Sequence, residues 1–343
     1  MLGIGERAYA YAKACGIIGK SFVGKRIARL AEVSRISDLD RLVFPHESRD
    51  LPARELLVDI EARIIQRAVN HIITIIDSFE KPPELLLRFV RTYEYEDLKT
   101  VCGALAQGET KSPIFTDIGR FRTIDFEAYP DLDAMLRGTE FEFLLQDDLR
   151  PDNKDAKIGD LAIQSELDRH YYRSLWEALF ALKKNDRTAV EKILCDEVCL
   201  RNAVLALRLR IYYGMSAEEI REKFISLESK NLKAFLVGPA EASLALTLDN
   251  RTDWKDWKWE RFLNPEKPGE PWRVDPRHFQ NAASKYLYRR ARFFFRRKPS
   301  SLDSIFCFIK LKLFEEDLLT SVAEGLGMGL SSRDVFTLLE VET

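Results

Sequence analysis

Histidine and cysteine, which supply most metal ligands and many nucleophiles, are scarce in this sequence. It has four histidines and five cysteines in 343 residues, and no two cysteines form a C-x-x-C pair. Cys195 and Cys199 would share a helix face, but no histidine lies beside them to complete a zinc site. The histidines, at 46, 71, 170 and 278, are scattered without a His-x-x-x-His pair. We therefore expect no catalytic residue, no metal site and no cofactor, and we expect buried, reduced thiols.

The sequence also lacks an excess of one charge and any long apolar run. Its 53 basic residues balance 55 acidic residues, so nothing attracts the whole chain to nucleic acid or anionic lipid. No run approaches the about 20 apolar residues of a membrane span. Arg7 and Lys13 interrupt the first apolar stretch, which excludes the layout of a signal peptide. We expect a cytoplasmic protein without a nucleic-acid partner, whose contact with a membrane, if any, is indirect.

Glycine is infrequent as well, yet one stretch that contains it raises the question of nucleotide binding. "ACGIIGKS" (14–21) has the spacing of a phosphate-binding loop, and "IITIID" (72–77) ends in an aspartate that could hold Mg²⁺. Such a loop needs a hydrophobic strand before it, whereas "ERAYAYAK" favours a helix. We interpret Gly16 and Gly19 as the end of this helix and Ser21 as the start of the next. A phosphate-transfer enzyme is therefore the least favoured hypothesis.

Helical periodicity is abundant. Between Pro52 and Pro82 the apolar residues recur at steps of three and four, with no glycine or proline between them. This spacing predicts one long helix, with "IITIID" as its last turns. The same spacing over 167–182 and 200–211 predicts two further helices. Strict alternation of apolar and polar residues is almost absent, so the expected fold is all-α.

Internal repeats subdivide the chain. "GMSAEEI" (214–220) and "GLSSRDV" (329–335) each join a helix-ending glycine to a capping box. A weaker copy, "YEYEDLKTVCGALAQG", ends at Gly108, and "SDLDRLV" (37–43) is similar to "PDLDAML" (130–136). The repeats predict three divergent helical units, with boundaries at 1–115, 116–228 and 229–343.

Three other segments carry separate interpretations. The tryptophan-rich segment 249–276 is expected to cover its own domain as a plug, with an aromatic ligand cage as the alternative. Acidic clusters at 94–97 and 315–317 are expected near helix N-termini, where the helix dipole favours anions, rather than as acid–base pairs. Residues 147–157 are typical of a surface connector.

The stretch "YLYRRARFFFRRK" (286–298) interleaves basic and aromatic residues. On a helix, Arg289, Arg292 and Arg296 share one face, and the apolar residues lie elsewhere. Three interpretations are open: a solvated basic face, docking onto protein or lipid headgroups, and, least favoured, nucleic-acid binding. The candidate interaction residues are Arg289, Arg290, Arg292, Arg296 and Arg297.

The last third of the chain resembles a known family. "CFIKLKLFEEDLLTSVAEGLGMGLSSRDVFTLL" (307–339) is similar to the C-terminal signature of the C subunit of V-type (A-type) ATPases, called subunit d in eukaryotes. The residues that fit are Lys310, Leu311, Lys312, Glu315, Ala323 and Glu324. Glu316 and Asp317 replace the Arg-Asn pair of the family, whereas Arg201 and Asn202 keep it in the second copy. The opening "YAYAKACGIIGK" also matches.

The resemblance implies a non-catalytic subunit of a rotary ATPase. Its three helical repeats would form a funnel-shaped socket on the cytoplasmic face of a membrane. The implied partners are the proteolipid ring below and the central-shaft subunits above, in ATP-driven ion transport or ATP synthesis. ATP would turn over in other subunits, and membrane contact would pass through the ring. The alternative is an all-helical cytosolic adaptor unrelated to ATPases.

Overall fold

Helices make up the regular structure of this protein. The computed structural model describes residues 4–147, 149–151, 160–227 and 230–341. It is 69% helix and, over these residues, contains no strand, which confirms the all-α prediction. The α-helices are α1 (Ile4–Lys20), α2 (Ile36–Val43), α3 (Ala53–Ile76), α4 (Glu84–Val90), α5 (Thr92–Ala106), α6 (Leu132–Leu136), α7 (Asp160–Phe180), α8 (Lys184–Tyr212), α9 (Ala217–Arg221), α10 (Lys230–Ala245), α11 (Pro276–Arg297), α12 (Leu302–Gly327) and α13 (Ser332–Leu338). The 3₁₀-helices are η1 (Gly24–Glu32), η2 (Gly119–Phe121), η3 (Phe126–Ala128), η4 (Glu142–Leu145), η5 (Arg251–Trp254) and η6 (Glu260–Phe262).

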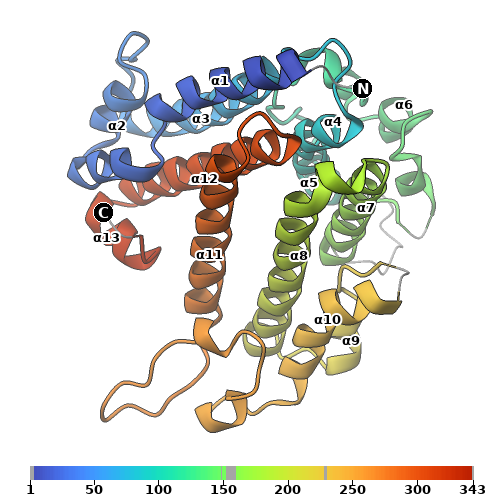
Figure 1. Cartoon of the computed structure of the whole chain (residues 1–343), viewed down its shortest axis with the longest axis vertical. Coiled ribbons are helices and arrows are strands. Elements are labelled where there is room, and N and C mark those ends of the chain that lie inside the picture. Colours follow the sequence, from blue (N-terminus) through green and yellow to red (C-terminus); the bar gives the residue numbers. More distant parts are fainter. Residues whose placement is uncertain (1–3, 148, 152–159, 228–229, 342–343) are drawn as a thin grey trace.

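Two long helices organise the packing. α12 packs against α1, α3, α8, α11 and α13, and α8 packs against α7, α10 and α11. In Figure 1, α1, α3 and α12 cross the upper part of the molecule, and α8 and α11 descend from it. The helices predicted from apolar spacing over 52–82, 167–182 and 200–211 are present as α3, α7 and α8. The apolar stripe of α3 is buried as its spacing requires, since Ile60 and Ile72 are both fully covered.

The buried apolar residues form three clusters. The largest lies between α3 to α8 and the neighbouring parts of α1, α10, α11 and α12. A second cluster joins the two ends of the chain, because Phe22 and Leu30 pack with Val322 and Phe336. The third lies between α8, α11 and the tryptophan-rich segment, whose four tryptophans are buried. The plug interpretation of that segment is confirmed, and the aromatic cage is excluded because the rings pack within the protein.

Glycines and capping boxes end and begin helices where the repeats predict them. Gly214 and Gly329 follow α8 and α12 with positive φ angles of 61° and 81°. Ser216 then caps α9 and Ser331 caps α13, each in a reciprocal capping box. Gly108, after α5, also has a positive φ of 74°. Residues with side chains rarely adopt this conformation, so glycine is required there. The division into three units stays a prediction.

The segment 14–21 is helical and forms no phosphate-binding loop. α1 continues through Gly16 and Gly19 to Lys20, so the helix expected here is present. The prediction that Ser21 starts the next helix is wrong. Its hydroxyl instead donates to the Ile17 carbonyl at 3.0 Å, which closes the last turn of α1, and η1 begins only at Gly24.

Two further predictions fail in part. Glu94 lies in the first turn of α5, but Glu315 to Asp317 lie in the middle of α12, where the helix dipole offers an anion little. Cys102, Cys199 and Cys307 are buried as expected, whereas Cys15 is exposed on α1. Most of the connector 147–157 lies outside the described residues.

Candidate interaction surfaces

A network of charged side chains joins four helices. Lys310 of α12 donates to Glu197 of α8 at 2.7 Å, and the Tyr172 hydroxyl of α7 donates to the same carboxylate at 3.0 Å. Asp168 of α7 accepts from Lys99 of α5 at 2.8 Å. Buried charges are stable only when they are paired in this way, so the network fixes the four helices relative to one another.

One side of this network is open to solvent. Arg201 of α8 donates to Asp168 at 2.5 Å and keeps 46% of its side chain exposed. Glu96 of α5 is 64% exposed and pairs with Lys99. Burial acts to raise the pKa of Asp168, but Arg201 and Lys99 outweigh it and hold that pKa below its usual value. Arg201 and Glu96 therefore present opposite charges at an accessible edge, where a charged partner could bind.

Glu316 and Glu315, adjacent on α12, have opposite electrostatic environments. The pKa of Glu316 is raised to about 8, chiefly by burial and with help from Asp317 and Glu96, against the hydrogen bond from Tyr93 at 2.6 Å and the charge of Lys312. Burial acts in the same direction on Glu315, but the Lys312 ammonium prevails and lowers its pKa. Sequence reasoning gave no sign of such a contrast, because it depends on burial and on partners outside α12 as well as on Lys312. These outside partners are Tyr93 for Glu316 and the Phe22 amide for Glu315.

Glu315 fastens the N-terminal segment onto α12. Glu315 and Lys312 form an ion pair in which both side chains are only 2% exposed. The Phe22 amide donates to the Glu315 carboxylate at 2.6 Å, and Lys312 lies 3.2 Å from the Ser21 hydroxyl. The Glu315 carboxylate accepts from these donors and has almost no solvent access. The cluster of Glu315 and Lys312 therefore holds the N-terminal segment in place and is not an acid–base site.

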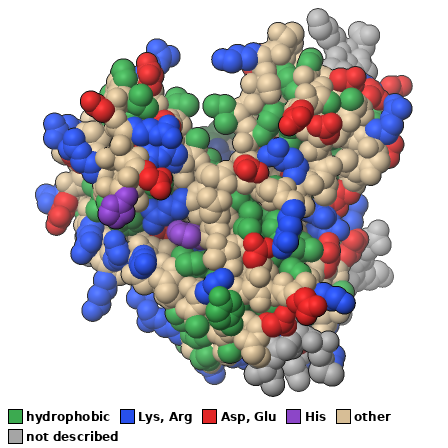
Figure 2. Space-filling view, turned by 90° about the horizontal axis from the view of Figure 1, so that it is seen from above, with side chains coloured by type: hydrophobic (Ala, Val, Ile, Leu, Met, Phe, Trp, Pro, Cys, Tyr) green, Lys and Arg blue, Asp and Glu red, His purple; other side chains and the backbone are tan. Residues whose placement is uncertain are grey.

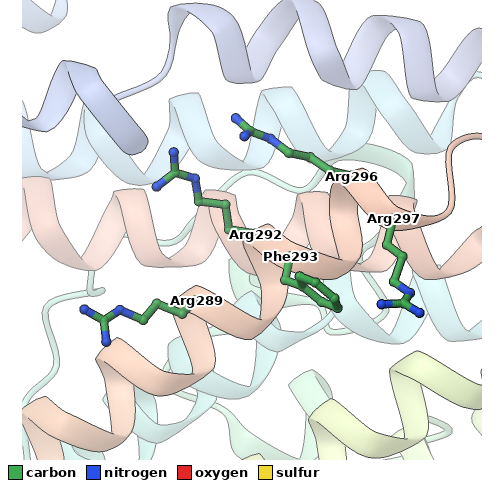
Figure 3. Close-up of a pocket in the computed structure, with 5 residues that line it drawn as sticks. All are labelled: Arg289, Arg292, Phe293, Arg296 and Arg297. Carbon is green, nitrogen blue, oxygen red and sulfur yellow. The ribbon is translucent and has the colours of Figure 1, made fainter.

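The predicted arginines do not all share one surface of α11. Arg290 turns toward α8, where its guanidinium lies 3.5 Å from Asp196 and over the ring of Tyr286. The other four arginines line an open depression together with one aromatic ring: Arg289, Arg292, Phe293, Arg296 and Arg297 (Figure 3). No local pattern distinguishes Arg290 from its neighbours, because its carboxylate partner is far away in the sequence.

The depression is basic and partly aromatic. In Figure 3, Arg292 and Arg296 point toward the N-terminal helices, whereas Arg297 points to the other side of α11. The guanidinium of Arg297 lies 5.3 Å from the centre of the Phe293 ring, which is itself 53% exposed. Among the described residues, no carboxylate lies within ion-pair distance of Arg292, Arg296 or Arg297. These side chains are available to an anionic partner.

Neither a metal centre nor a membrane span is found in the described residues. Nowhere in those ranges do three His, Cys, Asp or Glu side chains gather as metal ligands could. His170 instead shares a hydrogen bond of 2.7 Å with the Tyr95 hydroxyl, and His278 pairs with Glu340. Over the same ranges, each helix is too short or too polar to traverse a bilayer.

Comparison with known proteins gives two matches. The sequence profile of the ATP synthase (C/AC39) subunit family matches residues 49–335. An uncharacterized protein of Treponema pallidum (strain Nichols) is 27% identical over 325 residues, which cover 94% of this chain and 92% of that protein. Both matches extend over the charged network and the arginines of α11, so the two surfaces belong to the region that is shared.

Proposed function

Because the chain belongs to the family of V-type ATP synthase C/AC39 subunits, we propose that it is the non-catalytic central-stalk subunit of a rotary V-type ATPase. In this role it couples a rotating shaft to a membrane-embedded proteolipid ring, on the cytoplasmic face of the membrane. The complex uses this coupling for ATP-driven ion transport or for ATP synthesis. The observation that carries the proposal is the family match, which runs through nearly the whole chain.

The architecture suits a mechanical coupler. Such a subunit needs stiffness and two separate binding surfaces rather than a reactive pocket. α3, α8, α11 and α12 are 22 to 29 residues long and pack on one another. The charged network pins α5, α7, α8 and α12 together through hydrogen-bonded ion pairs, which resist sliding of one helix along another.

We assign one surface to each partner. The accessible edge of the charged network, with Glu96 and Arg201, is the proposed seat of the shaft. Figure 2 shows that the molecule seen from above has two lobes with an indentation between them. The depression on α11 is the proposed side toward the membrane sector.

Co-purification from solubilised membranes tests this function. A tagged chain should recover proteolipid and shaft subunits together. A variant in which Glu96 and Arg201 exchange their charges, Glu96→Arg with Arg201→Glu, should lose the shaft but keep the ring. Because Arg201 also pairs with Asp168, thermal unfolding checks that this variant keeps its fold. Exchange of an exposed pair elsewhere, Glu218→Arg with Arg221→Glu, is the matched control and should keep both. Recovery of soluble partners alone would support a cytosolic adaptor instead.

A further inference from the structure

Two segments of this nearly neutral chain contain basic residues and no acidic ones. Residues 7–31 contain six lysines and arginines, residues 276–298 contain eight, and neither segment contains an aspartate or a glutamate. Acidic residues slightly outnumber basic ones in the chain as a whole. A net charge near zero therefore conceals a strong local excess of positive charge.

The structure brings the two segments together. The ring of Tyr11 on α1 lies 5.4 Å from the ring of Phe295 on α11. The Gly24 amide, at the start of η1, donates to the Tyr288 hydroxyl at 2.9 Å. A Cβ atom on Gly24 would lie only 3.3 Å from the Arg292 guanidinium. The α1–η1 connection and the last turns of α11 thus form one continuous surface.

We call this the basic surface and define it by five side chains: Lys20, Lys25, Arg292, Arg296 and Arg297. Arg292 is half-buried and the other four are exposed. Within the described part of the chain, none of the five has a carboxylate within 4 Å. Figure 2 shows lysine and arginine side chains gathered on the left of the molecule, the side on which α2 and α13 lie in Figure 1, whereas acidic side chains are more frequent on the right.

Several exposed arginines elsewhere on the protein are paired with neighbouring carboxylates. Arg35 lies 3.2 Å from Asp38, Arg137 lies 3.5 Å from Asp133, and Arg221 lies 3.2 Å from Glu218. Concentrated charge without counter-charge is unfavourable for the isolated fold, because the cations repel one another. Its presence on one surface points to an anion supplied from outside the chain.

We propose that the basic surface binds the headgroups of anionic phospholipids. Its charges are spread over two elements, and the segments that carry them hold no acidic side chain that would orient a protein partner. Binding by many similar charges without fixed geometry is typical of lipid surfaces, whereas protein interfaces concentrate their energy in a buried, well-packed centre. Phe293, which is 53% exposed and lies beside Arg297, adds an apolar ring to this surface.

The inference rests on the proposed function for its setting. A subunit seated on a proteolipid ring and wider than its contact with that ring lies over the surrounding lipids. The expectation from sequence was a membrane contact made only through the ring. The basic surface adds a direct contact that would resist tilting of the subunit.

Vesicle binding by the purified chain tests the proposal without any other subunit. We expect binding to vesicles of phosphatidylcholine mixed with phosphatidylglycerol, and none to phosphatidylcholine alone. Raising the salt from 0.1 to 1 M shortens the Debye length from about 10 Å to about 3 Å and should abolish binding. Each lysine or arginine near an anionic surface contributes roughly five-fold to affinity, so Arg292→Gln, Arg296→Gln and Arg297→Gln together should weaken binding on the order of 100-fold.

The matched control is the triple variant Arg35→Gln, Arg137→Gln and Arg221→Gln. It changes the net charge by the same amount at exposed positions outside the two segments, and its binding should stay within a few-fold of the original. Should the α11 variant fail to fold by circular dichroism, Lys20→Gln with Lys25→Gln replaces it, with an expected loss of roughly 25-fold.

Three results would overturn the proposal: no binding to anionic vesicles, equal binding to both kinds of vesicle, or an equal loss in the control. If the chain binds no vesicle and its α11 variant loses the ring on co-purification, the partner of the basic surface is an acidic protein segment. That result would refute lipid binding and leave the central-stalk function standing. Normal vesicle binding without recovery of ring or shaft would refute the function alone.

Discussion

Removing Lys312 tests how the two ends of the chain are held together. Lys312→Met deletes the ammonium that is paired with Glu315 and keeps a side chain of similar length. Both residues are 2% exposed, so water cannot solvate the carboxylate that remains. Its other partners are the Phe22 amide at 2.6 Å and the Arg67 guanidinium at 3.9 Å.

The expected cost is large relative to the stability of the whole chain. Removing one partner of a buried ion pair lowers the free energy of unfolding by about 3 to 5 kcal/mol. The free energy of unfolding of a typical protein is only about 5 to 15 kcal/mol. Arg67 compensates in part, which favours the lower end of this range. The double variant Lys312→Met with Glu315→Leu should cost about 1 to 3 kcal/mol less than the sum of the single changes, because it leaves no unpaired charge.

Urea unfolding of the isolated chain measures all three variants, and its pH dependence adds a second readout. The pKa of Glu315 is lower in the folded chain than in the unfolded chain. Ionised Glu315 therefore contributes stability above a pH of about 4, and this contribution fades as the pH falls further. Burial lowers the pKa of Lys312, so its ammonium opposes part of this gain. The reasoning is refuted if Lys312→Met costs less than about 1 kcal/mol, as an exposed pair would, or if the single costs simply add.

Three further changes have defined outcomes. Glu316→Gln should make the chain more stable than the original at pH 9, by on the order of 2 kcal/mol. The original has a folded-state pKa of about 8 at Glu316, so it loses stability as the pH rises from about 4 through 8. Parallel pH profiles of thermal unfolding for the two proteins would contradict this prediction. Ser216→Ala and Ser331→Ala should each cost about 1 kcal/mol by urea unfolding, and a cost for only one of them would weaken the repeat. Gly325→Ala should destabilise by about 1 to 3 kcal/mol, because its methyl group would overlap Val335, and Val335→Ala should recover part of the loss; no recovery would place the strain elsewhere.

The sequence predicted those elements whose cause is local. α3, α7 and α8 follow from apolar spacing, and the capping boxes at Ser216 and Ser331 follow from residues three apart. The start of η1 could not be predicted in this way. Its position depends on the Phe22 amide, which Glu315 satisfies from 293 residues further along the chain.

The middle of α12 shows why its acidic cluster was misplaced. The helix is buried on nearly all sides from Leu302 to Lys312, so its sequence lacks the polar face that marks a continuing surface helix. Acidic residues after such a run predict a helix start, where the helix dipole favours them. Their partners, Tyr93 for Glu316 and Phe22 for Glu315, come from the first third of the chain and are joined only by the fold.

Only part of the basic surface could be predicted from the sequence. The arginines of α11 stand in one run, which is enough to propose an interaction helix. Arg290 is set apart from the run by Asp196, and Lys20 and Lys25 join it through contacts of Gly24 and Tyr11. Contacts between distant segments decide which charges remain unpaired, and these are the charges that a partner can use.

α12 links the two proposed binding surfaces mechanically. Its 26 residues span about 39 Å as a continuous helix. Lys310 and Glu316 connect it to the charged network, and Lys312 and Glu315 hold the segment that begins the basic surface. In the proposed function, a force on the shaft seat would reach the basic surface through α12 and one buried ion pair. Lys312→Met should therefore loosen the N-terminal part of the basic surface and leave the charged network intact. This one variant would separate the mechanical link between the two surfaces from the binding of a partner at the charged network.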